Sequence, residues 1–227
     1  MKKENRGTLW AALGCLGAFA VWTAAVRCVD VQPIGPQGSC VGFARLNGAV
    51  HELTGVHLPL YVLTDWLSVI PAGIVLGFAV LGLTQWIKRK RLLAVDRSIL
   101  VLGGFYGLVL GAYAFFEKVV INFRPVLLDG VLEPSYPSST TVLVLCVMPT
   151  AMLQMKERIS HEKTRRGVGL AMAAFTVFVV AGRFFSGVHW FTDIVGGVLL
   201  SVGLVLLYSF VLDGGHLSAN NGKTQGE

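Results

Sequence analysis

Side chains that can do chemistry gather in three polar segments of an otherwise apolar chain. These are residues 115–125 (FFEKVVINFRP), 135–141 (SYPSSTT) and 182–193 (GRFFSGVHWFTD). Their principal basic residues are Lys118, Arg124 and Arg183. Ammonium and guanidinium groups bind tetrahedral oxyanions, and the planar fork of arginine suits phosphate especially well. Taken together, the three segments predict a phosphate-binding site.

The third segment also offers a nucleophile. His189 and Asp193 are four residues apart, so they share one face if a helix has begun there. A carboxylate beside an imidazole fixes its tautomer and stabilises its cation, which prepares the other ring nitrogen to attack phosphorus. A His-x-x-x-Asp pair on its own is more often a structural hydrogen bond. We predict catalysis here because all three segments are expected at the same membrane face and together carry the groups of an anion-binding site.

The second segment leads directly into an expected helix. Ser138, Ser139 and Thr140 would place hydroxyls and free backbone N–H groups at the positive end of that helix. In isolation the same residues could act only as an N-cap, and the basic side chains could simply anchor helices among lipid headgroups.

The composition indicates what positions these segments. Of 227 residues, 54% are hydrophobic and 14% charged, and the mean hydropathy is +0.66. A soluble globular domain has about a quarter of its residues charged. The chain is therefore expected to be an integral membrane protein.

Six long uncharged stretches predict the membrane spans. About 20 apolar residues cross the hydrocarbon core as a helix. The stretches are 7–26, 66–87, 98–116, 134–155, 167–182 and 194–212. We expect an all-α bundle of six transmembrane helices over residues 1–212, followed by a polar, disordered cytoplasmic tail over 213–227.

Basic residues cluster before the first span, between the second and third spans, and between the fourth and fifth. Short basic loops stay cytoplasmic, so both termini are predicted inside the cell. Segments 27–65, 117–137 and 183–189 then face outward, and the plasma membrane is the expected location. Positive charge spread over membrane-flanking loops argues against a nucleic-acid partner. Cys28 and Cys40 share the first outer loop, which leaves a disulfide between them open.

These residues resemble the type 2 phosphatidic acid phosphatase superfamily, the lipid phosphate phosphatases. Its membrane members have six core helices and the motifs Lys-x6-Arg-Pro, Pro-Ser-Gly-His and Ser-Arg-x5-His-x3-Asp. The third motif matches from Arg183 through His189 to Asp193, with Gly182 in place of the leading Ser.

The resemblance implies a role for each matching residue. His189 would form a phosphohistidine, with Asp193 as its orienting partner. The expected phosphate-binding residues are Lys118, Arg124, Ser138, Ser139, Thr140 and Arg183. The substrate would be the phosphate or diphosphate of an amphiphilic lipid, at the outer face of the membrane. No metal or other cofactor is expected.

Two departures from the motifs refine this expectation. Lys118 and Arg124 are separated by five residues instead of six, which rotates Lys118 by about 100° on a helix. Thr140 replaces the histidine that protonates the leaving oxygen. A phosphate leaving group needs a proton less than an alkoxide does, so a polyprenyl diphosphate is the favoured substrate. Glu117, His51 and His57 remain open as replacement acids.

Two alternatives remain beside this hypothesis. One is a catalytically impaired homologue that binds phospholipid headgroups or a partner protein. The other is a lipid phosphotransferase, which would use the same site.

Overall fold

A computed structural model describes residues 3–223, and this part of the chain is helical without any strand. The helices are α1 (Lys3–Cys28), α2 (Ala44–Thr54), α3 (Leu58–Leu67), α4 (Val69–Arg89), α5 (Arg97–Lys118), α6 (Ser139–Arg158), α7 (Glu162–Phe185) and α8 (Phe191–Lys223). Short 3-10 turns form η1 (Pro36–Gly38) and η2 (Leu92–Ala94). The predicted all-α class is confirmed.

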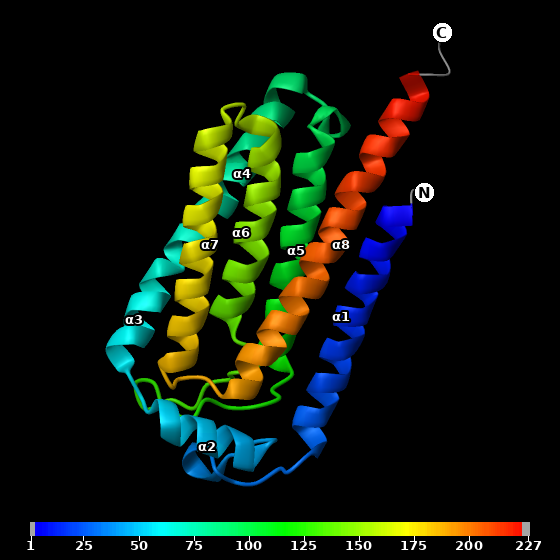
Figure 1. Cartoon of the computed structure of the whole chain (residues 1–227). Coiled ribbons are helices and arrows are strands. Elements are labelled where there is room, and N and C mark those ends of the chain that lie inside the picture. Colours follow the sequence, from blue (N-terminus) through cyan, green and yellow to red (C-terminus); the bar gives the residue numbers. More distant parts are fainter. Residues whose placement is uncertain (1–2, 224–227) are drawn as a thin grey trace.

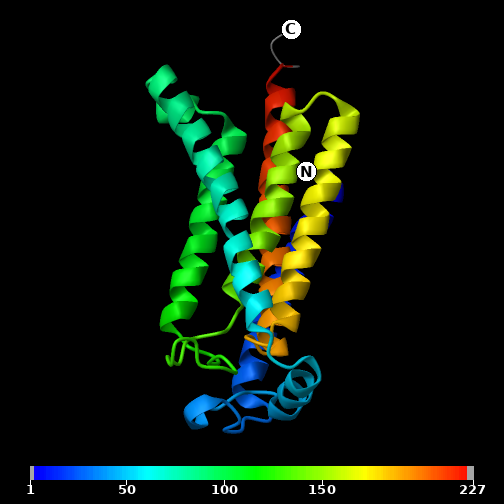
Figure 2. The same ribbon diagram turned by 90° about the vertical axis from the view of Figure 1, so that its left-hand side faces the viewer.

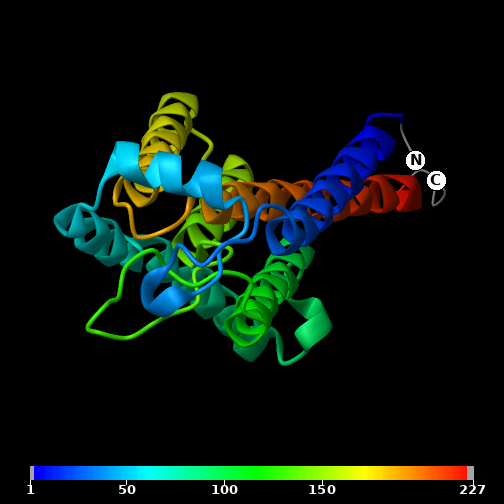
Figure 3. The same ribbon diagram turned by 90° about the horizontal axis from the view of Figure 1, so that it is seen from below.

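Six helical stretches in the described part of the chain are long and apolar enough to cross a membrane, one for each predicted span. The long helices run side by side between two ends of the bundle (Figure 1). Helix α8 packs along α1 and against α6, while α7 packs against α6 and α3. Helix α2 lies across one end of the bundle (Figures 1 and 3).

The second span differs from its predicted boundary. It begins at Leu58 and extends to Arg89, so α3 occupies part of the segment 27–65 that was expected to lie outside the membrane. The charge of Asp65 suggested a later start, yet Asp65 lies within α3. The helix is interrupted at Ser68 between α3 and α4. Pro71 contributes to this break because it has no N–H to donate to the carbonyl of Leu67.

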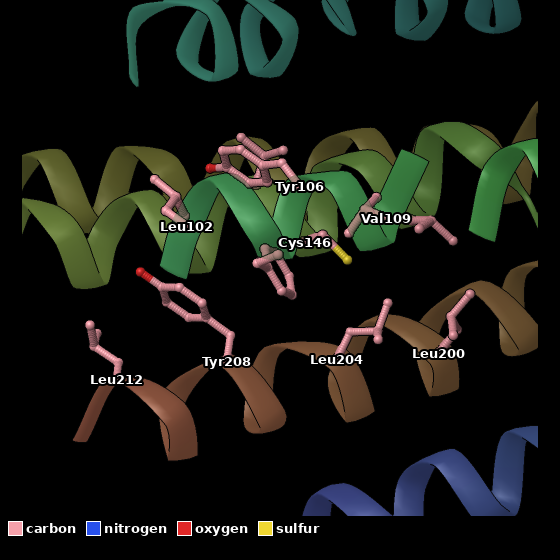
Figure 4. Close-up of a cluster of buried hydrophobic side chains, with 11 residues drawn as sticks. Leu102, Tyr106, Val109, Cys146, Leu200, Leu204, Tyr208 and Leu212 are labelled. Carbon is pink, nitrogen blue, oxygen red and sulfur yellow. The ribbon is translucent and has the colours of Figure 1, made fainter. Parts of the chain in front are cut away.

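A core of α5, α6 and α8 supports the end that carries the polar segments. Leu200, Leu204, Tyr208 and Leu212 recur every four residues and therefore share one face of α8. They pack against α5 and α6, including Leu102 and Cys146, as Figure 4 shows. The same three helices thus hold the start of α8 and the start of α6 in fixed relation.

All three polar segments reach the end of the bundle that carries α2 (Figures 1 and 2). The beginning of α1 and the end of α8 lie toward the opposite end, together with the α4–α5 and α6–α7 connections (Figure 1). Helix α8 continues to Lys223, so the structure describes helix over much of the tail for which the composition predicts disorder. Residues 224–227 of that tail lie outside the described part.

Candidate active site

His189 lies in the short loop between α7 and α8, and its side chain is almost completely buried. Its Nδ1 is 3.2 Å from the backbone carbonyl of Ser135. Its Nε2 lies 3.1 Å from Nη1 of Arg124 and 3.4 Å from Nη2 of Arg183. A carbonyl only accepts and a guanidinium only donates, so Nδ1 carries the proton and Nε2 presents its lone pair.

Electrostatics favour the neutral form of this imidazole. Burial lowers the pKa of His189 well below its usual value of 6.5, and the charges of Arg124 and Arg183 lower it further. The hydrogen bond to the carbonyl of Ser135 opposes this shift. Attack on a bound anion requires an unprotonated nitrogen, and the neutral ring presents the lone pair of Nε2 next to two cations.

Asp193 lies close to His189, but it is not the hydrogen-bond partner that its spacing suggests. Its Oδ2 is 3.8 Å from Nδ1 of His189, which is too long for a hydrogen bond. That oxygen accepts from the backbone N–H of Trp190 at 3.0 Å, and Oδ1 accepts from Nδ2 of Asn122 at 3.2 Å. Asp193 therefore caps the start of α8 and places a buried carboxylate beside the ring.

Arg183 lies in the last turn of α7, and its side chain is only 1% exposed. Its Nε and Nη1 have no hydrogen-bond partner among the described residues. Nη1 lies 3.6 Å from Oδ1 of Asp65, and the guanidinium stacks on the ring of Tyr61. Buried donors left unbonded are costly, so this side chain is prepared for an anionic acceptor.

Arg124 is held by the loop between α5 and α6. Its backbone N–H donates to the carbonyl of Glu133, and its Nε donates to Oε2 of Glu133 at 3.0 Å. An isolated bridge between Phe123 and Pro134 pairs the two sides of this loop. The second guanidinium is thereby held next to Nε2 of His189, as that of Arg183 is.

The start of α6 contributes Ser139 and Thr140, which line a cavity next to His189. Ser138 is fully buried and does not line this cavity; its hydroxyl accepts from Thr141, and its N–H donates to the carbonyl of Asp193. Ser138 thus joins α6 to α8. Ser139 and Thr140, in the first turn of α6, still line the cavity, and the first N–H groups of a helix have no partner within it.

The cavity has a volume of about 320 Å³ and is lined by both polar and apolar residues. Its polar residues include Asp65, Glu117, Arg124, Ser139, Thr140 and His189. Its apolar residues include Val109, Leu110, Val142, Leu143 and Leu200. An amphiphile with an anionic headgroup matches this division. Among the described residues, no group of three His, Cys, Asp or Glu side chains is arranged to hold a metal ion.

Lys118 does not join the other cations. It is exposed at the end of α5 and does not line the cavity, as its shortened spacing suggested. Of the three candidate acids, Glu117 lines the cavity. His51 packs on Trp190, with 5.4 Å between ring centroids, and His57 lies 2.9 Å from the carbonyl of Thr54.

Several site residues were not predicted from the sequence. Tyr61, Asn122, Glu133 and the carbonyl of Ser135 carry no motif of their own. Asp65 did carry a signal, because it is the one charge in the apolar stretch 58–87. A lone carboxylate in such a stretch is a candidate for function by default.

Comparison with known proteins identifies the family. A family model described as the PAP2 superfamily matches residues 99–213, which is more than half of the chain. The chain belongs to the PAP2 superfamily. The region that this PAP2 model matches includes every site residue predicted from the motifs, whereas Tyr61 and Asp65 precede it.

A solved structure shares the fold of this PAP2 protein. It is that of a transmembrane PAP2-type phosphatidylglycerolphosphate phosphatase from Bacillus subtilis. The TM-score is 0.59 at 18% sequence identity, covering 89% of this chain and 96% of the other. A search of curated proteins finds no match.

Proposed function

We propose that this PAP2 protein is an integral-membrane lipid phosphatase that works through a phosphohistidine. The observation that carries the proposal is the neutral Nε2 of His189, at 3.1 and 3.4 Å from two guanidinium groups. A phosphate held by Arg124 and Arg183 would lie against this lone pair. The family and the amphiphilic cavity support a lipid substrate.

In the first step, Nε2 attacks phosphorus in line, and the bond from phosphorus to the leaving oxygen breaks. The imidazole then carries the phosphoryl group on Nε2 and its original proton on Nδ1, so the ring becomes cationic. Asp193, 3.8 Å from Nδ1, stabilises that charge. In the second step, water attacks phosphorus, Nε2 departs with its electron pair, and phosphate is released.

We further propose that a polyprenyl diphosphate is the preferred substrate. Thr140 lines the cavity where the related motif has a histidine, and a hydroxyl has no useful pKa for protonating an alkoxide. A phosphate leaving group is much less basic and can depart unprotonated. The apolar residues that line the cavity suit a hydrocarbon chain.

The site is proposed to face the outside of the cell. It lies at the end of the bundle opposite the basic α4–α5 and α6–α7 connections, which the positive-inside rule assigns to the cytoplasm. Both termini would then be cytoplasmic.

Turnover in detergent tests the activity. The full chain should release phosphate faster from a polyprenyl diphosphate than from phosphatidate, and His189→Ala should abolish release. His161→Ala is the matched control, because His161 is exposed at the opposite end of α7. A clear preference for phosphatidate contradicts the substrate assignment. Headgroup binding without any phosphate release would favour the catalytically impaired homologue. Two observations favour that alternative: Thr140 replaces the motif histidine, and Lys118 does not line the cavity.

A further inference from the structure

The ring of Tyr61 contacts both arginines of the site. Its centroid lies 4.6 Å from the guanidinium carbon of Arg183 and 5.8 Å from that of Arg124. We propose that Tyr61 is a positioning residue, whose ring holds the two guanidinium groups at the spacing that a phosphate group requires. This inference rests on the proposed function and adds a residue from α3 to the site.

Two like charges need such support. Arg124 and Arg183 both approach Nε2 of His189, so their guanidinium groups lie close enough to repel each other. The negative face of an aromatic ring attracts a cation within about 6 Å, and this attraction is strongest where water is excluded. Arg183 is 1% exposed, so it meets that condition. A single ring next to both cations offsets their repulsion and orients each plane.

Carboxylates complete the arrangement on either side. Asp65 follows Tyr61 by one helical turn on α3 and lies 3.6 Å from Arg183, while Glu133 accepts from Arg124 at 3.0 Å. Without the ring beside both guanidinium groups, each would be free to turn further toward its own carboxylate. The pair would then no longer converge on a phosphate group.

Close backbone packing brings α3 to this place. A Cβ added at Gly182 would lie 2.6 Å from Cγ2 of Thr64, so a larger residue would force the Thr64 side chain or α3 itself to shift. At the start of α3, the N–H of His57 donates to the carbonyl of Ser186 at 2.9 Å. Gly187 has a φ of +66°, and its added Cβ would lie 1.9 Å from the carbonyl oxygen of Gly55.

The glycine at position 182 thereby has a physical explanation. The related motif has serine at this position, and a serine Cβ would push α3 away from α7. Gly182 instead lets α3 approach until Tyr61 reaches Arg183. Gly182, which departs from the motif inside the matched region, and Tyr61, which precedes that region, thus act together to position Arg183.

The test compares three variants of the full chain in detergent. Binding of inorganic phosphate is measured by calorimetry, and phosphate release from a polyprenyl diphosphate gives kcat and KM. Tyr61→Phe keeps the ring and should stay within about threefold of wild type for both. Tyr61→Leu keeps an apolar side chain without the ring and should weaken phosphate binding and lower kcat/KM by roughly tenfold or more. Trp66→Leu is the matched control, since Trp66 is an exposed aromatic residue on the same helix.

Gly182→Ala tests the positioning of Tyr61 without changing the Tyr61 side chain, because it alters how closely α3 packs on α7. It should reproduce the loss in phosphate affinity, and combining it with Tyr61→Leu should add little, because both changes remove one interaction. Wild-type affinity and kcat/KM in Tyr61→Leu overturn the inference, as does a loss in Tyr61→Phe that equals the loss in Tyr61→Leu. A wild-type protein that neither binds nor releases phosphate overturns the proposed function itself, and the inference with it.

Discussion

Asp193 lies 3.8 Å from Nδ1 of His189, yet the proton on Nδ1 is directed to the carbonyl of Ser135 at 3.2 Å. The backbone carbonyl thus selects the tautomer, while the carboxylate supplies charge at a slightly longer distance. These two tasks were expected to fall to Asp193 alone. Their separation makes the contribution of the carboxylate charge measurable.

Asp193→Asn should slow turnover while leaving the ring orientation intact. Asparagine still accepts a hydrogen bond from the N–H of Trp190, so the start of α8 remains capped. The cationic phosphoimidazole loses its nearby negative charge, and we expect kcat to fall by about 10- to 100-fold with little change in KM. Rapid-quench measurement of the phosphoenzyme should show slower formation. An unchanged rate of formation would contradict the electrostatic role.

Activity should persist into mildly acidic solution. The nucleophile must be neutral, and burial together with two arginines keeps the pKa of His189 well below 6.5. We therefore expect the kcat/KM profile of the wild type to stay flat from about pH 8 to pH 6 and to fall only below that. An acid limb centred at or above pH 6.5 would contradict a lowered pKa.

The same shift predicts a pH dependence of stability. In the unfolded chain His189 takes up a proton near pH 6.5, whereas in the folded protein it remains neutral to lower pH. The unfolded state therefore binds more protons in this window, and His189 lowers the free energy of unfolding as the pH falls below 6.5. Thermal unfolding of His189→Gln should show a weaker dependence on pH between 6.5 and 5 than that of the wild type. Equal dependence would contradict the assignment.

Thr140→His should restore protonation of an alkoxide leaving group. Position 140 lines the cavity at the start of α6, so an imidazole there can reach the headgroup. General acids contribute about 10²–10⁴ in rate, and we expect phosphatidate turnover to rise by at least about tenfold. Diphosphate turnover by the same variant is the internal control and should change little. A variant that gains nothing on phosphatidate would show that Thr140 does not limit that reaction.

Two native cysteines can report the orientation of the site. Cys28 and Cys40 are free and exposed near the end of the bundle that carries α2, whereas Cys146 is buried in the core. After mild reduction of intact cells, a membrane-impermeant maleimide should label the wild type. Cys28→Ser combined with Cys40→Ser should abolish the labelling. Labelling only after the cells are opened would place the site on the cytoplasmic side.

The residues alone determined the six spans and the predicted convergence of three polar segments at one membrane face. Hydrophobic run length and charge placement are local properties, and helices that alternate in direction must return every second connection to the same face. The spacing of Arg183, His189 and Asp193 also belongs to one short segment. Predicting this motif therefore required no knowledge of contacts between distant parts of the chain.

Tertiary structure decided which atoms meet. Tyr61 lies more than 100 residues before Arg183, and their contact depends on how closely α3 packs on α7 at Gly182. The carbonyl that holds His189 belongs to Ser135, in a different loop. Lys118 matched by residue type, but it is exposed at the end of α5 and does not line the cavity. Such outcomes depend on the packing of whole helices against one another, which residue type and local spacing do not specify.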